Sequence, residues 1–382
     1  MTRNPDSWCE LMLPHVVIVG GGFGGLAAAR GLRKAAVRVT LIDKRNYHVF
    51  RPMLYQVATG LLSADEISGP LRSIFSHQKN LDVLLDELIG INSEQRTVRL
   101  TRGDLQYDFL ILATGIQYNY FGHDEWRHFA PGLESLDDAD HVRDKILRAF
   151  ERAEEMASIE QATGQEICRE LTFALVGAGT VGVEMASTLA EMSHMALAHD
   201  FRHIDPRLAR IVLYEAGPRI LPTYPENLAN KALQHLESLG VEVHTNARVT
   251  HVDSEGIVVG GAKIQAGTVL WGAGVVASPA GRWLGAETDK FGKIKVGPDF
   301  LVPGHSEVFA IGDTAHVVAP VRNLLGFKSK TSMVMPGVAQ PAIQEGKYVG
   351  RVIRSRVGGT GNRNLSGTGI RANLQLWGEC MP

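Results

Sequence analysis

Residues 16–25 read V-V-I-V-G-G-G-F-G-G, and this short stretch decides the fold. The β-branched run predicts a buried strand of a parallel sheet that ends directly at glycines. Residues 26–33 are typical of a helix, and a second predicted strand over 37–43 closes on Asp43. This order of strand, glycine-rich turn, helix and acid-terminated strand is that of a dinucleotide-binding βαβ unit. An ordinary turn between a strand and a helix is the weaker alternative.

Each part of this unit has a physical task. Gly20 allows the tight turn, Gly22 lets a pyrophosphate approach the backbone, and Gly25 lets the helix pack closely on the strand. The first amide groups and the positive dipole end of the helix face the phosphates. Asp43 can accept hydrogen bonds from both hydroxyls of a ribose.

The same pattern restarts in the middle of the chain, with Gly177, Gly179 and Gly182 in the loop and Glu215 as the later acid. A strand, a helix and a second strand are predicted around this loop over residues 171–176, 181–192 and 211–214. A carboxylate at the second strand's end binds ribose hydroxyls and repels a 2'-phosphate, which favours NADH over NADPH, although Arg219 weakens that preference. We therefore predict an α/β, three-layer protein with two Rossmann-like dinucleotide-binding domains.

The first of these domains is predicted to be discontinuous. We expect its first part over 14–135, the second domain over 136–285, a return to the first over 286–356, and an atypical flexible tail, rich in Gly, Thr, Asn and Ser, over 357–382. The S-x-x-E capping box at Ser63 predicts a helix that runs toward Phe75. The other predicted elements are a hairpin over 98–112, helices over 137–161, 225–239 and 336–354, and strands over 241–244 and 308–313.

Residues 193–208 lengthen the connection within the second unit. His194, His199 and His203 lie there, and on a helix His199 and His203 would share one face. A zinc site is one interpretation of these histidines and the nearby Asp200 and Asp205. No third ligand has metal-like spacing, so we predict a solvated helix extension and no metal.

Composition excludes several classes of function. The chain has 382 residues, 45% hydrophobic residues and a formal net charge of -2, which give no reason to expect nucleic-acid binding. The cysteines, Cys9, Cys168 and Cys380, show no paired spacing, which disfavours thiol chemistry and fits a cytoplasmic, reducing compartment, with Cys168 an apolar filler. No window approaches the roughly 18 uninterrupted apolar residues that span a bilayer, and residues 1–13 lack the apolar stretch of a signal peptide.

Two later motifs carry a resemblance to a known group. Ala113-Thr114-Gly115 and the later Gly312-Asp313 resemble the paired FAD motifs of the pyridine-nucleotide-dependent flavoprotein reductases. Disulfide reductases and sulfide:quinone reductases of that group need cysteines that this sequence lacks. The chain is more similar to the type II NADH dehydrogenases, the single-subunit NADH:quinone oxidoreductases. That similarity is carried by residues 46–60, 173–184 and 336–344.

The resemblance implies an enzyme that moves hydride from NADH to FAD and then two electrons to a quinone, without proton pumping. It implies that Asp313 binds the ribityl chain of FAD and that Glu184, near the flavin, assists charge or proton transfer. It also implies that Gln340 and Gln344 line the quinone-facing side of the site. The expected cofactor-binding residues are Gly20, Gly22, Gly25, Asp43, Gln56, Ala113, Thr114, Gly115, Gly312, Asp313 and Ala339 for FAD, and Gly177, Gly179, Gly182, Glu215 and Gly274 for NADH. As alternatives, Glu184 is only an early-helix acid favoured by the dipole, and the two glutamines, on one helical face, bridge to a neighbouring loop.

The sequence departs from this group after residue 356. Members of the group continue with a G-x-L-A-x-M/I-G-R region and amphipathic membrane-attaching helices, so we expect the C-terminus here to be truncated or frameshifted. A shifted reading frame permits G-K-L-A-T-M-G-R in the tail. Two alternatives follow, namely an FAD- and NADH-binding pseudoenzyme or remnant without quinone turnover, and a soluble NAD(P)H-dependent reductase of another acceptor. The resemblance also leads us to expect a homodimer, peripheral on the inner face of the cell membrane.

Overall fold

The computed structural model describes residues 13–159, 162–322 and 328–358, so nearly all of the predicted tail lies outside the described residues. The chain forms two compact units. Unit 1 consists of Met1–His48, Gly69–Gln117 and Val276–Pro382, and unit 2 of Val49–Ser68 and Tyr118–Val275. Unit 1 is therefore discontinuous in sequence.

This division differs from the predicted domain limits in three segments. Residues 49–68 and 118–135, which we expected in the first domain, belong to unit 2, and residues 276–285 belong to unit 1. The physical reason is packing: Leu54, Val57 and Leu133 are buried in the same hydrophobic core as Phe173 and Leu213. Which cofactor each domain holds remains a prediction.

Unit 1 is built on a parallel five-stranded sheet with the order β20-β9-β1-β2-β5. These strands are β1 (His15–Val19), β2 (Arg38–Asp43), β5 (Leu81–Leu85), β9 (Phe109–Leu112) and β20 (Val308–Ala310). β1 is central, because Val16 pairs with Val39 on one side and with Phe109 on the other. The whole of β1 is buried, as the apolar run predicts for a parallel strand covered on both faces.

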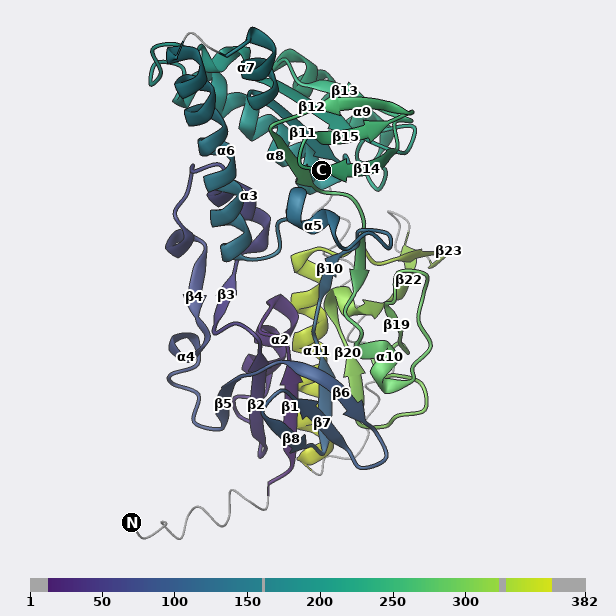
Figure 1. Ribbon diagram of the computed structural model, residues 1–382. Coiled ribbons are helices and arrows are strands. Elements are labelled where there is room, and N and C mark those ends of the chain that lie inside the picture. The colour runs from purple at the N-terminus through teal and green to yellow at the C-terminus, as the bar shows by residue number, and fades with distance from the viewer. Residues whose placement is uncertain (1–12, 160–161, 323–327, 359–382) are drawn as a thin grey trace, which may run out of the picture. The chain divides into compact units, whose positions relative to one another are not determined.

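Helices α2 (Phe23–Gly31) and α11 (Ala339–Val357) lie side by side in unit 1 (Figure 1). Their backbones approach so closely that a Cβ added at Gly346 would come within 2.2 Å of the carbonyl oxygen of Gly24. Any side chain at Gly346 would push the helices apart, because protein interiors are close-packed. This contact fixes where α11 sits along α2, and so fixes which α11 side chains reach the glycine-rich loop.

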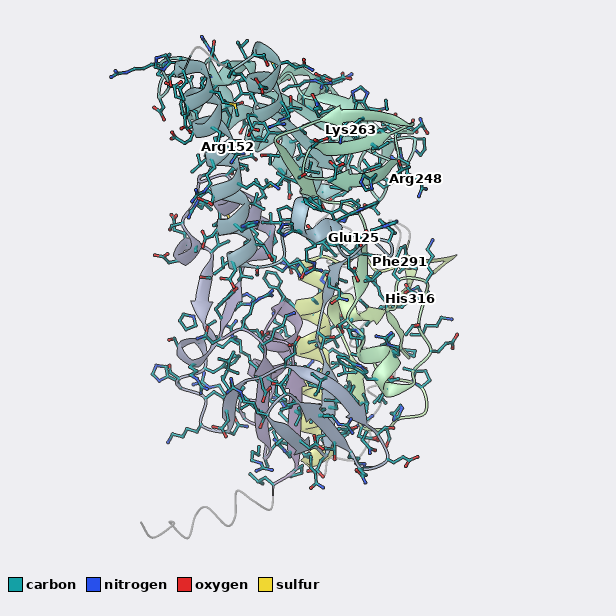
Figure 2. All side chains as sticks on the ribbon, viewed as in Figure 1. Glu125, Arg152, Arg248, Lys263, Phe291 and His316 are labelled. Atoms are coloured by element: carbon teal, nitrogen blue, oxygen red, sulfur yellow. The ribbon has the colours of Figure 1, made fainter. Side chains whose placement is uncertain are left out.

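Unit 2 contains a second parallel sheet, with the order β13-β12-β11-β17. Its strands are β11 (Thr172–Val176), β12 (Arg210–Tyr214), β13 (Glu242–His244) and β17 (Thr268–Trp271), and its main helices are α6 (Leu136–Ser158), α7 (Gly164–Glu170), α8 (Thr180–Glu191) and α9 (Glu226–Ser238). Ser135 caps α6 by accepting a hydrogen bond from the Asp138 amide. Arg152, labelled in Figure 2, joins α6 to α7 through a 2.8 Å hydrogen bond from Nε to Glu170.

Shorter elements complete the two units. Unit 1 also contains α4 (Leu71–Ile74), β6 (Leu88–Asn92), β7 (Thr97–Leu100), β8 (Gly103–Gln106), α10 (Ala280–Leu284), β19 (Ile294–Lys295), η5 (Gly312–Thr314), β21 (Ala315–His316), β22 (Val318–Arg322) and β23 (Lys328–Val334). Unit 2 also contains η1 (Arg51–Met53), α3 (Leu54–Ala58), η2 (Ala64–Glu66), α5 (Trp126–Phe129), η3 (Met192–Ala196), η4 (Pro206–Leu208), β14 (Val249–Asp253), β15 (Gly256–Val259) and β16 (Ala262–Gln265). Strands β3 (Tyr47–Val49), β4 (Ser68–Pro70), β10 (Ile116–Tyr118) and β18 (Val275–Ala277) lie where the chain passes between units.

Some predicted elements need correction. The helix expected from Ser63 toward Phe75 is wrong, although its capping box forms and the Ser63 amide donates to Glu66 at 2.7 Å. That box starts only the short turn η2, because β4 and Pro70 interrupt any longer helix. The last helix begins at Ala339 and not at residue 336, and it continues to Val357.

Candidate active site

The first glycine-rich loop connects β1 to α2 in unit 1. Gly20 has φ +109°, and a Cβ added there would lie 2.2 Å from the Ala113 carbonyl oxygen, so only glycine fits. A Cβ on Gly25 would lie 1.8 Å from the Gly20 carbonyl oxygen. Gly22 differs from both, because a Cβ added there would meet no atom of the described chain within 4 Å. The loop is therefore closed where helix and strand pack, and open where a phosphate would sit.

Asp43 at the end of β2 holds this loop in shape. Its carboxylate accepts hydrogen bonds from the Gly21 amide at 2.5 Å and the Arg45 amide at 2.7 Å. Burial raises the pKa of Asp43, and these two amides oppose that shift. No side chain among the described residues caps the start of α2, and the start of a helix is where backbone amides bind anions. Open space at Gly22, a helix start without a side-chain cap and an adjacent carboxylate fit the pyrophosphate and ribose of a dinucleotide such as FAD.

The two later motifs of unit 1 meet at the carboxyl ends of neighbouring strands, since β9 pairs with β20. The Gly115 amide donates to the Thr314 hydroxyl at 2.8 Å, and the hydroxyls of Thr114 and Thr314 lie 3.1 Å apart. Thr114 also shares a 2.5 Å hydrogen bond with Ser278. The structure thus brings Ala113 to Gly115 beside Gly312 and Asp313 at the same sheet edge as the first glycine-rich loop. Ligands of open α/β sheets bind at this edge.

Helix α11 begins next to this edge with three of the predicted residues. Ala339 and Gln340 lie in its first turn, where Gln340 is exposed, and Gln344 follows one turn later and is half-buried. A small hollow at the helix start is lined partly by Gly312, Asp313 and Glu345. The placement of both glutamines on one helix end agrees with the expected spacing, but their contact with a quinone remains a prediction.

Glu345 is a site residue that the sequence analysis missed. Its side chain is buried, and its Oε2 accepts a 2.6 Å hydrogen bond from the Gly312 amide. Helical spacing could have revealed it, because Glu345 shares the buried face of α11 with Ala342 and Val349. An acid on an otherwise apolar helix face needs a partner and often has a functional role.

The second glycine-rich loop, between β11 and α8 in unit 2, repeats the geometry of the first. Gly177 has φ +97°, and a Cβ on Gly182 would lie 1.9 Å from the Gly177 carbonyl oxygen. A Cβ on Gly179 would meet nothing within 4 Å in the described chain. The Glu215 carboxylate accepts from the Ala178 amide at 2.8 Å, as Asp43 does from Gly21.

Arg219 does not oppose the nucleotide preference expected from Glu215. Its guanidinium donates to the Pro222 carbonyl oxygen at 2.6 Å and to the Tyr224 carbonyl oxygen at 3.0 Å. Two of its nitrogen atoms are therefore engaged by the backbone, whereas a 2'-phosphate is recognised by an arginine that offers its fork to the ligand. The predicted weakening of the NADH preference by Arg219 is therefore not supported by its contacts, and the preference predicted from Glu215 remains a prediction.

Glu184 lies on α8 just beyond its first turn. Burial raises the pKa of Glu184 to about 7, so its charge changes near neutral pH. The alternative, that Glu184 is only an acid favoured by the helix dipole, is less well supported. The dipole acts mainly within the first turn and would lower the pKa of a carboxyl group, whereas the pKa of Glu184 is raised. A carboxyl group poised near neutrality suits proton or charge transfer.

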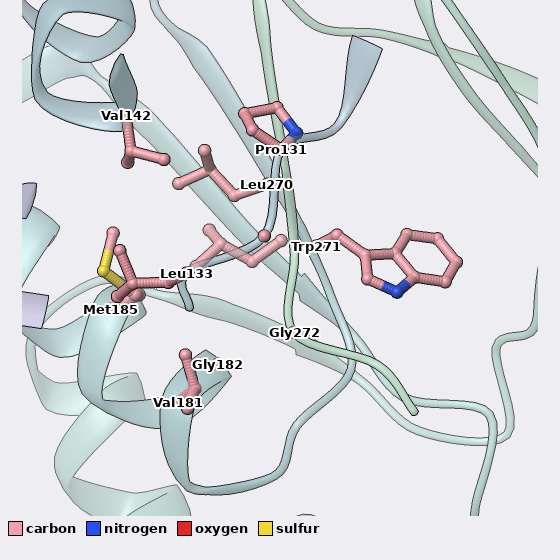
Figure 3. Close-up of a pocket in the computed structure, with 11 residues that line it drawn as sticks. Pro131, Leu133, Val142, Val181, Gly182, Met185, Leu270, Trp271 and Gly272 are labelled. Carbon is pink, nitrogen blue, oxygen red and sulfur yellow. The ribbon is translucent and has the colours of Figure 1, made fainter. Parts of the chain in front are cut away.

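A small apolar hollow adjoins the second loop at Val181 and Gly182. In Figure 3 the side chains of Val142, Leu133 and Met185 gather on one side of this hollow, while the Trp271 indole points away from them. The hollow is lined by Pro131, Gly132, Leu133, Val142, Leu175, Val181, Gly182, Met185, Leu270, Trp271 and Gly272.

Two further predicted residues also lie in unit 2. Gln56 is on α3, where its Nε2 donates to the Tyr55 hydroxyl at 3.2 Å, so it shares a unit with Glu184 and not with the first loop. Gly274 follows β17 with φ +67°, and a Cβ there would meet the Phe121 ring at 2.4 Å. Assignment of Gln56 to FAD remains a prediction.

The histidine-rich insertion has a structural partner. His199 and His203 do not lie on a helix, so the predicted helix extension is wrong beyond the π-helical turn η3. Glu154 on α6 accepts hydrogen bonds from the Arg202, His203 and Ile204 amides and from His203 Nδ1 at 2.8 Å. Within the described residues no group of His, Cys, Asp and Glu could hold a metal ion. Cys168, expected as a buried filler, is exposed.

The chain belongs to the pyridine nucleotide-disulphide oxidoreductase family, whose sequence pattern matches residues 14–346. Its relatives include proteins named type II NADH:quinone oxidoreductase. It is 42% identical over 359 residues to NdhA of Mycobacterium tuberculosis, across 90% of this chain and 72% of that protein. It is 41% identical to Ndh of the same organism, across 90% of this chain and 73% of that protein.

A solved structure confirms the fold. NDH2 from Plasmodium falciparum in complex with NADH superposes with a TM-score of 0.77 at 21% identity, and covers 89% of this chain and 83% of that one. The predicted α/β fold with Rossmann-like domains and the predicted family are therefore confirmed. None of the helices in the described part of the chain combines the length and hydropathy that a bilayer crossing requires.

Proposed function

We propose that this chain is an FAD-dependent NADH dehydrogenase that delivers two electrons to a quinone. The observation that carries the proposal is the repetition of one loop geometry, because two such loops, each with its acid, provide for two dinucleotides in one chain. The relatives named as NADH:quinone oxidoreductases support the same reaction. When bound, FAD supplies a centre that accepts hydride from NADH and releases two electrons to a quinone.

The residues of unit 1 are assigned to FAD. The open backbone at Gly22 and the start of α2 would hold the pyrophosphate, and Asp43 would accept from ribose hydroxyls. Gly115 and Asp313, at the neighbouring strand ends, would complete the site. Their support is the hydrogen-bonded contact between the two motifs through Thr314.

The residues of unit 2 are assigned to NADH. Gly179 and the start of α8 would hold its pyrophosphate, and Glu215 would bind the ribose hydroxyls. Glu184, with its pKa near 7, is assigned the exchange of a proton with solvent while the nucleotides react.

The start of α11 is assigned to the quinone side, through Gln340 and Gln344. Val334 and Val338 are exposed shortly before α11 in the sequence, and Val318, which is also exposed, pairs with Val334 on the hairpin β22–β23. Exposed aliphatic side chains of this kind suit an apolar acceptor or a membrane surface. We therefore also propose peripheral binding at the inner face of the cell membrane, and a homodimer, both of which co-sedimentation with vesicles and light scattering would test.

The test uses the purified chain under anaerobic conditions. Its absorption spectrum is expected to show bound flavin, which bleaches on addition of one equivalent of NADH and recovers on addition of a water-soluble quinone. NADPH serves as the matched control, and it should bleach the flavin more slowly. Bleaching without recovery would favour a cofactor-binding pseudoenzyme, recovery only with another acceptor would favour a soluble reductase, and absence of flavin would contradict the proposal.

A further inference from the structure

Glu345 is the carboxyl group that α11 turns toward the interior of unit 1. Only 6% of its surface is exposed, and it lies on the same helix face as the buried residues Ala342 and Val349. Burial of a carboxyl group is costly unless the group is hydrogen-bonded or neutral. Glu345 therefore needs a hydrogen-bond partner or a proton on its carboxyl group.

The partner of Glu345 is the turn that carries Asp313. The Gly312 amide donates to Glu345 Oε2 at 2.6 Å, and a Cβ added at Gly312 would lie 3.3 Å from the Cβ of Ala342. On its other side, a Cβ added at Gly337 would lie 2.4 Å from the Oδ1 atom of Asp313. The turn is thus held between α11 and the segment that precedes it, with Glu345 making the polar link.

Few charged groups face Glu345. Asp313 on η5 and Lys293 on the segment before β19 line the same hollow, and no other charged residue lines it among the described residues. The α2 face that packs on this part of α11 is formed by Gly24, Ala27 and Ala28, which do not titrate. Burial raises the pKa of Glu345 to about 7 and Asp313 adds to this shift, whereas the Gly312 amide and Lys293 oppose it.

We propose that Glu345 is a positioning residue of the flavin site, which holds the Gly312–Asp313 turn in place and links proton uptake by its carboxyl group to electron uptake by the bound flavin. The inference rests on the proposed assignment of FAD to unit 1. Electrons added to an FAD held by Asp313 would increase the negative charge near Glu345 and so would favour the neutral form of its carboxyl group. The electrons come from NADH and the proton comes from solvent. By linkage, a proton taken up on reduction makes the midpoint potential fall more steeply with pH.

The test measures the flavin midpoint potential of the loaded protein between about pH 6 and about pH 8, on both sides of the Glu345 pKa. Glu345→Gln keeps the size and one acceptor for the Gly312 amide, but it cannot titrate. Lys347→Gln, on the exposed face of the same helix, is the matched control. We expect the wild type and K347Q to show the same bend near pH 7, and E345Q to lose it.

A second variant tests the positioning role. Glu345→Met fills similar space without an acceptor, and it should weaken FAD binding about tenfold, because the buried Gly312 amide loses its partner. E345Q should bind FAD within about twofold of the wild type. Equal FAD affinity of E345M and the wild type would overturn the positioning role.

The outcomes separate this inference from the proposed function. A wild type without flavin contradicts the proposed function, whereas a flavin-loaded E345Q that keeps the bend overturns only the role of Glu345. If E345Q fails to fold, hydrogen exchange at the Gly312 amide of the loaded wild type tests the same link. After correction for intrinsic exchange, protection there should change through pH 7, and unchanged protection would overturn the proposal.

Discussion

The two glycine-rich loops have nearly the same backbone geometry but different surroundings. The first glycine has φ +109° at Gly20 and +97° at Gly177, and a Cβ on the last glycine would lie 1.8 Å and 1.9 Å from the carbonyl oxygen of the first. In both loops an acid accepts a hydrogen bond from the amide after the first glycine. The loop itself therefore provides for a dinucleotide but does not determine which one.

The surroundings differ in what they add. In unit 1 the loop is joined by the strand ends at Gly115 and Gly312 and by the buried acid Glu345 on α11. In unit 2 the corresponding neighbours are Glu184 on α8 and an apolar hollow beside the loop. We infer that the neighbouring groups give the two similar loops different roles, and variants of one loop at a time can test this.

The largest expected effect comes from adding a methyl group where each loop is closed. Gly25→Ala and Gly182→Ala should each destabilise their own unit by about 3 kcal/mol, because the new Cβ collides with a loop carbonyl oxygen. Hydrogen exchange would check this, with β1 reporting on unit 1 and β11 on unit 2. Unequal losses would show that the loops are not structurally equivalent.

Gly22→Ala and Gly179→Ala are the matched controls, since a Cβ at either position meets nothing within 4 Å in the described chain. Each should change stability by less than about 0.5 kcal/mol. A loss of stability as large as that of Gly25→Ala would show that a Cβ at these positions does collide with the chain.

The next effect concerns the two acids. Glu215→Gln should weaken NADH binding about tenfold and leave the flavin content unchanged, because an amide offers fewer acceptors to the ribose hydroxyls. It should also reduce the preference for NADH over NADPH, since the repelling charge is gone. Asp43→Asn should weaken FAD binding by a similar factor and leave NADH binding unchanged. Titrations of both cofactors against both variants check this. If Glu215→Gln weakened FAD binding and Asp43→Asn weakened NADH binding, the assignment of the two loops would be reversed.

A smaller effect concerns the insertion that only unit 2 carries. Desolvation opposes ionisation of Glu154, but its hydrogen bonds to His203 and the neighbouring amides prevail and lower its pKa from 4.5 to about 2. The lowered pKa means that the carboxylate stabilises the fold above about pH 4.5 and that this stability is lost as pH falls toward 2.

Glu154→Gln should therefore destabilise unit 2 by about 1 kcal/mol at neutral pH, a value reduced because the site is partly exposed. Urea unfolding of this variant and of the exposed neighbour variant Glu151→Gln measures the difference. The gap between E154Q and the wild type should shrink as pH falls below about 4.5. A gap that is constant with pH would show that the carboxylate charge is not responsible.

The smallest effect is expected at Glu184. Glu184→Gln should lower the turnover rate about threefold near neutral pH, because solvent can supply the proton while the nucleotides perform the redox chemistry. Both cofactors should bind as in the wild type. The wild-type pH profile should bend near pH 7 and that of the variant should be flat there. A variant profile with the same bend would assign the titration to another group.

The sequence predicts best the features that rest on local rules. The loops, Asp43, Glu215 and the buried strand β1 follow from residue types at fixed spacing, and the family and fold that they indicate are confirmed. The grouping of residues 49–68 with unit 2 depends on burial of Leu54 and Val57 against distant residues, which no local pattern reveals. Glu345 depends on a contact with Gly312 from another segment, although its place on an apolar helix face gave a signal.

The central claim is that the two loops hold different nucleotides, and its most direct measurement places a bulky side chain where each pyrophosphate would sit. Gly22→Val and Gly179→Val are purified, and flavin absorbance, NADH binding and bleaching by NADH are recorded. We predict that G22V lacks flavin but still binds NADH, and that G179V carries flavin that NADH no longer bleaches. A G22V variant that retains flavin, or a G179V variant bleached at the wild-type rate, would contradict the account.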